Sequence, residues 1–343
     1  MSRTLDIEPF LTCISMQDVV LLDARSPSEF RHASIPGAHN LPLLTDDHRA
    51  QVGTEYKQRG KEAAIILGFK LAGPLFAQHI ERALALAPHR RVVLYCWRGG
   101  MRSQILAWVL GVAGFEVTLL RGGYKSFRHW VLNLLSADLP PVKVLGGKTG
   151  AGKTELLEEL KATGAQVIDL EHLANHRGSA FGALGLGDQP SQENFENTLA
   201  WSLHGLIPGQ SVWMENESRL IGKLKLPPKI YDTLRSSQVY EVDLPLAERM
   251  DRIWAEYGVF NQEDLVACTK KIESKLGTER CRQAIRALEQ DDAHGWLQEI
   301  LAYYDRQYQK ASETRSPDSL HTFQFDRFEA KKIASVLTDA IRY

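Results

Sequence analysis

A cysteine followed by two glycines and two arginines is the first arrangement in this sequence that could do chemistry. In "VVLYCWRGGMRS", residues 92 to 103, Cys96 ends a run of strand-forming residues, and Arg98 and Arg102 follow it. The intervening glycines let backbone N–H groups curl inward, as in anion-binding loops. Because nearby cations and a following helix N-terminus favour the thiolate form of cysteine, the pattern predicts a reactive Cys96 in an anion site. A buried structural cysteine is the alternative.

A second arrangement is typical of phosphate binding. The segment "VKVLGGKTGAGKTELLEEL" contains the pattern G-x-x-x-x-G-K-[ST] between an apolar strand and a helical run. Glycines in such a loop let backbone N–H groups wrap one phosphate, the lysine reaches the next, and the threonine hydroxyl is a ligand for Mg²⁺. The pattern therefore predicts a site for a polyphosphate or a diphosphate. Its residues are Gly147, Gly150, Gly152, Lys153 and Thr154.

Acidic side chains follow two further apolar runs. Asp169 and Glu171 come after "AQVI", and Glu215 and Glu217 come at the end of "SVWM". Parallel sheets gather ligands at the carboxyl ends of their strands, so we expect these acids to face the phosphate-binding loop. One of them is then a candidate for the acid that contacts a metal ion beside the phosphates. Solvated loop acids are the alternative, because Asp and Glu are mostly surface residues.

These residues need a scaffold that places strand ends side by side. Strand-like runs at residues 19–22, 38–41 and 92–95 alternate with helix-like segments, among them residues 71–86. This alternation predicts an α/β fold with a parallel sheet. "SADLPP", residues 136–141, breaks the alternation and is the best linker candidate. We therefore expect one domain over residues 1–136 and a P-loop domain over residues 137–343, whose last third is mostly helical.

The composition excludes several classes of protein. A net charge of −1 over 343 residues provides no global attraction for nucleic acid, so such binding needs a local patch. The N-terminus lacks the layout of a signal peptide and eighteen apolar residues never run together, which predicts a cytoplasmic protein without a membrane partner. The four cysteines lack C-x-x-C pairs, which argues against a disulfide framework and a zinc site.

Basic residues in the last third supply further candidates. Arg249 and Arg252 lie three apart on one helical face, a spacing that would let them close over phosphates. The segment "KKIESKLGTERCRQAIR" is by default a solvated helix face stabilised by pairs four residues apart.

The first half resembles a rhodanese domain. The resemblance rests on "LLDARSPSEFRHASIPGAHNLPL" followed by "YCWRGGMRS", and it implies that Cys96 stands where rhodaneses carry sulfur as a persulfide. Five residues separate Cys96 from Arg102, a spacing shared with tyrosine and dual-specificity phosphatases, and such a loop could accept a tetrahedral oxyanion. Those phosphatases have histidine where this chain has Tyr95, which weakens the phosphatase interpretation.

The whole chain resembles the tRNA 2-selenouridine synthase family. The resemblance rests on "CWRGGMRS", "RGGYKSFR", "GGKTGAGKT" and "ENESRLIG" in that order and spans about residues 5 to 340. It implies a transferase that exchanges sulfur for selenium at the wobble 2-thiouridine of tRNAs that read Lys, Glu and Gln codons. A geranyl group from geranyl diphosphate first alkylates the sulfur, and selenophosphate then displaces the geranylated sulfur.

The resemblance also implies roles for individual residues. The Lys153 loop would hold the diphosphate leaving group, and Arg98 and Arg102 would hold selenophosphate beside Cys96. Cys96 would either carry selenium or act as a nucleophile that helps to remove the geranylthiol. Further candidate contacts to the tRNA are Trp97 and Tyr124 as stacking faces, Arg121, Lys125 and Arg128 for the anticodon loop, and Lys270, Lys271 and Lys275 for the tRNA body. For Tyr124 an ordinary core position is the alternative. No tightly bound cofactor is expected, and Mg²⁺ is a candidate only.

Two other functions fit the same motifs. One is a P-loop ATPase or kinase with a fused rhodanese-type sulfur carrier, in which hydrolysis depends on Glu215 or Asp169. The other treats the first half as a phosphate-ester binding or regulatory module without a role on tRNA. Steep salt dependence of RNA binding would separate the tRNA enzyme from that module, and ATP turnover would identify the first alternative.

Overall fold

The computed structural model describes residues 2 to 340, and the chain divides into two compact units. The first unit contains the residues up to Leu134 together with Glu196–Trp201, and the second contains Leu135–Phe195 and the residues from Ser202 onward. The sequence analysis expected a single boundary after residue 136. The structure instead assigns part of one later helix to the first unit.

The first unit is built on a parallel sheet, as the alternation of strands and helices predicted. Its strand order is β1-β5-β4-β2-β3, and all neighbouring strands pair in parallel. The strands are β1 Arg3–Leu5, β2 Val20–Asp23, β3 His39–Asn40, β4 Arg91–Tyr95 and β5 Glu116–Leu120. The helical elements are α1 Ile7–Ile14, α2 Pro27–His32, α3 Asp46–Ala72, η1 Gly73–Leu75, α4 Phe76–Leu86, α5 Met101–Val112 and α6 Gly123–Ser136.

Strand β4 lies at the centre of this sheet and ends directly before Cys96. Its residues from Val92 to Tyr95 are all buried, because helices cover both faces of a parallel sheet. Leu94 packs in one core with Leu22 of β2 and Leu110 of α5. Helix α5 starts directly after the Cys96 loop, with Gly100 as its N-cap. The fold thus places Cys96 between a central strand and a helix N-terminus, as the sequence predicted.

Helices α3 and α4 contain the most apolar long stretch among the described residues. An eighteen-residue window within residues 46–86 is long and apolar enough to cross a membrane by length and composition alone, and 17% of it is buried. The stretch is not one straight helix, because Gly60 has a non-helical backbone and η1 separates α3 from α4. Ala72 and Ala83 pack in the same core as the sheet. The two helices are therefore part of the first unit's packing.

The second unit has its own parallel sheet, with β6 in the middle of the order β12-β11-β6-β8-β7. Its strands are β6 Val142–Gly147, β7 Gln166–Ile168, β8 Val212–Glu215, β11 Gln238–Asp243 and β12 Leu320–Gln324, and β9 Leu220–Ile221 pairs antiparallel with β10 Leu224–Lys225. The helices beside these strands are α7 Lys153–Ala162, α8 Leu170–Ala174, α9 Gln192–His204, α10 Pro228–Ser236 and α16 Ala330–Asp339. The central position of β6 puts the phosphate-binding loop between the ends of β8 and β11.

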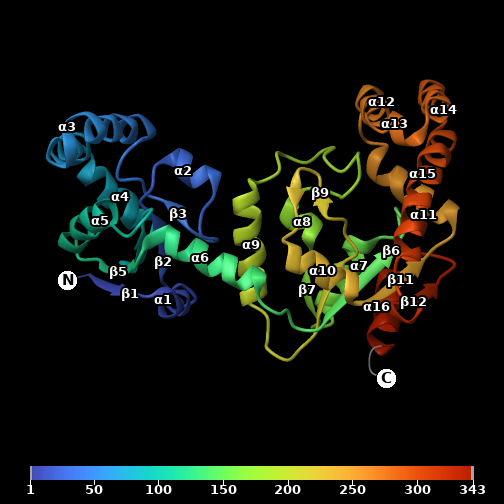
Figure 1. Cartoon of the computed structure of the whole chain (residues 1–343), viewed down its shortest axis with the longest axis horizontal. Coiled ribbons are helices and arrows are strands. Elements are labelled where there is room, and N and C mark those ends of the chain that lie inside the picture. The colour runs from blue at the N-terminus through green and yellow to red at the C-terminus, as the bar shows by residue number, and fades with distance from the viewer. Residues whose placement is uncertain (1, 341–343) are drawn as a thin grey trace. The chain divides into compact units, whose positions relative to one another are not determined.

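The last third is mostly helical, as expected, and it has its own core (Figure 1). It consists of α11 Leu246–Tyr257, α12 Gln262–Lys271, α13 Glu273–Leu276, α14 Thr278–Glu289 and α15 Ala293–Glu313, before η2 Pro317–Ser319. Trp296 is fully buried there and its indole N–H donates to the Thr269 hydroxyl. Cys268 and Cys281 are buried in the same cluster as free thiols, which makes them packing residues.

Candidate active sites

The Cys96 loop of the first unit holds its sulfur beside a hydroxyl group. Cys96 is 3% exposed, and its Sγ lies 3.1 Å from Oγ of Ser103 and 3.8 Å from the Gly100 carbonyl oxygen. Ser103 stands in the first turn of α5, so the helix N-terminus and this hydroxyl lie next to the sulfur. A hydroxyl so placed can donate a hydrogen bond to a thiolate. Sequence reasoning placed Ser103 at the helix start but did not assign it to the cysteine.

A second glycine-containing segment fixes the shape of the Cys96 loop. The Tyr124 N–H donates to the Cys96 carbonyl oxygen (2.8 Å), and the Lys125 N–H donates to the Trp97 carbonyl oxygen (3.0 Å). Gly123 makes this approach possible, because a Cβ at that position would lie 2.2 Å from the Cys96 carbonyl oxygen. Its φ of +60° also favours glycine. The "RGGYKSFR" motif therefore holds the backbone of the Cys96 loop in place.

Arg102 has a different partner from the one that the sequence suggested. Its guanidinium forms an ion pair with Glu29 of α2, with nitrogen–oxygen distances of 2.6 and 3.3 Å. Burial raises the pKa of Glu29, but Arg102 and Ser26 outweigh burial and lower it below its usual value. The group next to the Cys96 sulfur is therefore Ser103, and Arg102 is occupied by Glu29. Arg98 is exposed beside the loop.

Of the two aromatic residues proposed as stacking faces, only Trp97 is accessible. Trp97 is 39% exposed, whereas Tyr124 is fully buried. The Arg25 guanidinium lies 3.8 Å from the centre of the Tyr124 ring, and Asp23 pairs with Arg25 at 2.6 Å. The prediction that Tyr124 stacks on a base is wrong, because its ring belongs to a buried cluster. The alternative, a core aromatic, is correct.

The basic residues after β5 also differ from expectation. Arg128 pairs with Glu196 at 2.7 Å and donates to Asn197 Oδ1 at 2.6 Å, so its charge is neutralised within the first unit. Arg121 forms an exposed ion pair with Asp6. Lys125 is exposed beside the Cys96 loop. Arg128 is therefore a packing residue, and Lys125 remains a candidate for RNA phosphates.

The phosphate-binding loop of the second unit lies between β6 and α7, as predicted. Gly152 is the N-cap of α7 with φ of +76°, a conformation that favours glycine. A Cβ there would lie 2.3 Å from the Phe328 ring and 2.8 Å from the Arg252 guanidinium. These two side chains cover the loop from outside, and the Arg252 guanidinium stacks 3.4 Å from the Phe328 ring centre. The loop glycines thus give both backbone freedom and close packing.

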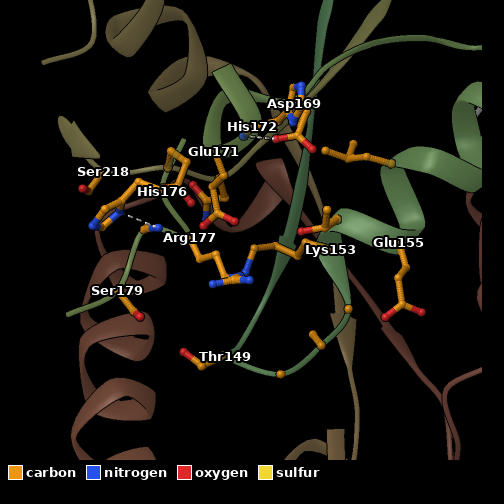
Figure 2. A pocket seen from close by; sticks show the side chains of 18 of the residues that line it. Thr149, Lys153, Glu155, Asp169, Glu171, His172, His176, Arg177, Ser179 and Ser218 are labelled. Atoms are coloured by element: carbon orange, nitrogen blue, oxygen red, sulfur yellow. Dashed lines mark hydrogen bonds between the residues drawn. The ribbon is translucent and has the colours of Figure 1, made fainter. Parts of the chain in front are cut away.

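Lys153 is held by a tyrosine and two acids. Its Nζ lies 3.2 Å from the Gly147 carbonyl oxygen and 3.3 Å from the Tyr308 hydroxyl of α15. Burial lowers the pKa of Lys153, but Tyr308, Glu171 and Glu217 outweigh burial and raise it above its usual value. Lys153 is therefore a cation at neutral pH. Figure 2 shows its side chain directed into the same part of the cavity as those of Glu171 and Arg177.

Two of the predicted strand-end acids face the cavity together. Glu171, in the first turn of α8, and Glu217, after β8, line the cavity with Lys153, and their carboxyl oxygens approach the same position beside Gly178. Burial and the charge of Glu171 raise the pKa of Glu217 to about 8. Burial also raises the pKa of Glu171, although Lys153 opposes this. Two buried carboxyl groups in contact cannot both ionise readily, so the pair retains a proton.

Glu215 does not face the cavity. Its carboxyl oxygens accept the backbone N–H groups of Leu170 (2.9 Å) and Glu171 (3.3 Å), at the start of α8. Burial and the neighbouring Asp169 raise the pKa of Glu215 well above its usual value. Asp169 does line the cavity, and its Oδ1 accepts the His172 N–H at 2.6 Å. The expectation that Glu215 faces the phosphate-binding loop as a candidate metal-contacting acid is therefore wrong.

The arginine pair predicted to close over phosphates is split between two roles. Arg249 is 3% exposed and pairs with Asp305 of α15 at 2.7 and 2.9 Å, which excludes it from a moving lid. Arg252 pairs with Glu155 and lines the cavity beside the loop. Lys270, Lys271 and Lys275 are exposed on α12 and α13, and Lys275 lies at the cavity.

The cavity beside Lys153 is large and is lined by apolar as well as charged residues. Its volume is about 1340 Å³, and it extends from the phosphate-binding loop to α11 and α15. Its apolar and aromatic lining residues include Leu157, Val167, Ile168, Leu173, Leu186, Ile253, Tyr257, Tyr303, Tyr304 and Tyr308. Among the described residues, no group of three or more His, Cys, Asp or Glu side chains is arranged to hold a metal ion. The cavity therefore combines an anion site with space for an apolar group.

Comparison with known proteins identifies both units. Residues 140–337 match the tRNA 2-selenouridine synthase AAA domain, and residues 10–129 match the rhodanese-like domain. A protein of Bdellovibrio bacteriovorus named tRNA 2-selenouridine synthase is 36% identical over 94% of this chain and 96% of its own length. The chain belongs to the tRNA 2-selenouridine synthase family.

Other tRNA 2-selenouridine synthases match to different extents. That of Nitrosomonas europaea is 42% identical, and the match covers 72% of this chain and 66% of the relative. That of Marinobacter nauticus is 35% identical over 88% of this chain and 90% of the relative. The chain thus spans just under two thirds of the Nitrosomonas europaea protein and nearly all of the Bdellovibrio one.

Several contacts in the two candidate sites could not be recognised in the sequence. Nothing in the spacing linked Glu29 to Arg102, because 73 residues separate them. Tyr308 is 155 residues from Lys153, and the helix-forming sequence around Tyr308 does not indicate a contact with the phosphate-binding loop. Gly178 could have been noticed as a glycine in a polar loop, "NHRGSAFG", but its closeness to Glu171 and Glu217 is a property of the fold alone.

Proposed function

We propose that this chain replaces sulfur by selenium in the wobble 2-thiouridine of tRNA, in two group transfers. The second unit transfers a geranyl group from geranyl diphosphate to the sulfur, and the first unit then uses selenophosphate to form 2-selenouridine. The name of the relatives supports the overall conversion. The tRNAs that read Lys, Glu and Gln codons, bound through the anticodon stem-loop, are the proposed substrates.

The residues that line the second unit's cavity are the main support for the first transfer. Lys153 and the N–H groups of its loop form an anion site, and apolar and tyrosine side chains line the same cavity. An allylic diphosphate has these two parts, a charged diphosphate and an apolar chain. Glu215, the acid that could have oriented a hydrolytic water, is bound to the α8 backbone instead. These features favour diphosphate capture over nucleotide hydrolysis.

Geranyl transfer makes the later replacement chemically feasible. A thiocarbonyl sulfur leaves poorly, whereas an S-alkylated sulfur on the same carbon can be expelled as a thiol. As the C1–O bond of geranyl diphosphate breaks, the phosphate-binding loop would stabilise the charge on the departing diphosphate. When Mg²⁺ is bound, the Thr154 hydroxyl and diphosphate oxygens would hold it, and it would neutralise part of the charge on the diphosphate.

The Cys96 loop is the proposed site of the second transfer. Its N–H groups, the α5 N-terminus and Arg98 form a surface suited to the selenophosphate anion. Ser103 holds the sulfur of Cys96 in position. Trp97, exposed next to Cys96, is the proposed stacking face for the wobble base.

The test is mass analysis of nucleosides from 2-thiouridine tRNA incubated with the protein, geranyl diphosphate and selenophosphate, each omitted in turn. We expect a gain of one geranyl group without selenophosphate, and its conversion to 2-selenouridine when selenophosphate is added. Cys96→Ala should abolish selenation and leave geranylation, whereas Lys153→Ala should weaken geranylation. Loss of geranyl transfer in folded Cys96→Ala would contradict this division of labour.

ATP turnover tests the competing function. A P-loop ATPase or kinase fused to a sulfur carrier would hydrolyse ATP and leave 2-thiouridine unchanged under every condition. Folded protein that binds tRNA and shows this behaviour would favour the competing function over group transfer.

A further inference from the structure

Two carboxyl groups meet in the second unit's cavity at a single glycine. A Cβ at Gly178 would lie 2.6 Å from Oε1 of Glu171 and 3.1 Å from Oε2 of Glu217. The two side chains come from different elements, since Glu171 lies in the first turn of α8 and Glu217 follows β8. Two buried carboxyl groups this close together cannot both ionise readily, so one of them keeps a proton. The pair therefore holds one proton beside the proposed geranyl-transfer site.

The surrounding charges keep this pair at one negative charge. Lys153 favours ionisation of Glu171, whereas Glu217 and burial oppose it. The titratable and charged groups that face Glu171 are Lys153, Asp169, Arg177, Glu215, Glu217, Glu256 and Tyr257. One carboxylate next to one ammonium group is the arrangement that leaves the least unbalanced charge in this buried site.

S-alkylation of 2-thiouridine needs a group that accepts a proton. The sulfur of the neutral base forms a bond to C1 of the geranyl group, and the C1–O bond breaks with its electron pair going to diphosphate. The base then carries a positive charge, which is lost when the electrons of the N3–H bond return to the ring. The N3 proton must go to a nearby base. No oxidant or reductant is involved, and the products are S-geranyl-2-thiouridine, diphosphate and one proton.

We infer that Glu171 is the general base that takes the N3 proton of 2-thiouridine during geranyl transfer, and that Glu217 positions it through their shared proton. This inference rests on the proposed function. Glu171 is less buried than Glu217, and the positive charge of Lys153 favours ionisation of Glu171 more than that of Glu217. It is therefore the member placed to meet both the substrate and the cation.

Three other cavity groups that could accept a proton, Asp169, Glu256 and His176, are already engaged. Asp169 accepts the His172 N–H, and Glu256 is paired with Arg177 at 2.5 Å. His176 accepts the Gly178 N–H on Nδ1, so its remaining nitrogen, Nε2, carries the proton in the neutral ring. Burial and Arg177 also lower the pKa of His176, which makes it a weaker base.

Substrate binding would strengthen Glu171 as a base. In the structure, the ammonium group of Lys153 compensates the negative charge of the carboxyl pair. A diphosphate bound to Lys153 would take over that cation and add negative charge to the cavity. Both changes favour uptake of a proton by Glu171. The base would therefore become most effective when the geranyl donor is in place.

The experiment compares Glu171→Gln with Glu158→Gln, a control at an exposed position on α7 that also lines the cavity. Single-turnover geranyl transfer to an anticodon stem-loop containing 2-thiouridine is followed across pH, and binding of geranyl diphosphate is measured separately. We expect Glu171→Gln to lower the transfer rate by about 100-fold or more at neutral pH, because general bases contribute about 10²–10⁴. Its binding of geranyl diphosphate should be unchanged or tighter, because a negative charge beside Lys153 is removed.

The pH profile separates a base from a merely structural residue. The defect of Glu171→Gln should shrink at high pH, where 2-thiouridine loses its N3 proton to solvent. Glu217→Gln should lower the transfer rate less than Glu171→Gln does, and it should move the acid limb of the profile to lower pH, because no second carboxyl group then competes with Glu171 for ionisation. It also serves as the second variant if Glu171→Gln fails to bind geranyl diphosphate.

Three results would overturn the inference. Transfer by Glu171→Gln at the rate and pH profile of the wild type would remove Glu171 as the base and leave the proposed function intact. A defect of equal size at every pH would assign Glu171 a structural role. Absence of geranyl product from wild-type protein that binds geranyl diphosphate would refute the proposed function and this inference together.

Discussion

Replacement of Gly123 by alanine tests how the Cys96 loop is held. Gly123 has φ of +60°, and a Cβ there would lie 2.2 Å from the Cys96 carbonyl oxygen and 2.4 Å from the Gly99 nitrogen. These are backbone atoms, so no side chain can move aside and the loop itself must shift. Gly37→Ala is the matched control, because Gly37 has φ of +79° and a Cβ there would have no atom within 4 Å.

The expected loss of stability has two parts. A left-handed backbone costs alanine about 1–2 kcal/mol, and this applies to both variants. A shift of the loop in Gly123→Ala also breaks the 2.8 Å hydrogen bond from the Tyr124 N–H to the Cys96 carbonyl oxygen. An unsatisfied buried group costs about 1–3 kcal/mol, so the free energy of unfolding of the first unit should fall by about 2–5 kcal/mol.

Two measurements check this prediction. Urea unfolding should give a lower free energy of unfolding for Gly123→Ala than for Gly37→Ala. Peptide mass analysis after brief iodoacetamide treatment should show faster alkylation of Cys96 in Gly123→Ala alone. Cys96 is 3% exposed in the intact loop, so a displaced loop would increase access to its sulfur. Equal stability and equal alkylation in the two variants would refute the assignment of Gly123 as the contact that shapes the loop.

Three further predictions concern the second unit. The folded protein raises the pKa of Glu217 to about 8, so protonated Glu217 stabilises the fold at low pH and this contribution is lost as the pH rises towards 8. Glu217→Gln should therefore flatten this part of a plot of melting temperature against pH. An unchanged slope would contradict the prediction. Glu215→Leu should lower the free energy of unfolding by about 1–3 kcal/mol, because the N–H groups of Leu170 and its neighbour lose their acceptor; full stability with lost activity would instead indicate a catalytic acid. If Lys270 and Lys271 contact tRNA phosphates, alanine at each should weaken binding and reduce the slope of log affinity against log salt by about 1, and filter binding at several salt concentrations would show whether it does.

The parts of the fold that local pattern determines were predictable. Buried parallel strands are continuous apolar runs, and this located β2, β4, β6 and β8 to within a residue or two. Helix α3 was not predicted apart from its last two residues, because its first half is mostly polar and exposed and the helix as a whole has no apolar face. Strand β12 was missed for a similar reason, since "LHTFQ" is a half-exposed edge strand with few apolar residues.

The candidate sites divide in the same way. The residue types and spacing around Cys96 and Lys153 predicted both anion-binding loops, because backbone curvature and helix start are local properties. The partner that each of these side chains contacts is not determined by the local sequence. Sequence alone could not show that Glu29 would take Arg102, that Glu215 would turn to the α8 backbone, or that Tyr124 would be buried against Arg25. In each case the partner comes from another element, and packing decides which of several acids or cavities a side chain meets.

The assignment of Glu196–Trp201 to the first unit affects how the chain folds during synthesis. Asn197 is fully buried and donates to the Ser34 carbonyl oxygen (2.9 Å) and to the Tyr124 hydroxyl (2.8 Å). Those acceptors are made early, but Asn197 follows Tyr124 by 73 residues. At about 5–20 residues per second, the ribosome would need several seconds more before the first unit could be completed. The nascent rhodanese-like unit therefore cannot complete these two hydrogen bonds until residues 135–195 of its neighbour have also been translated.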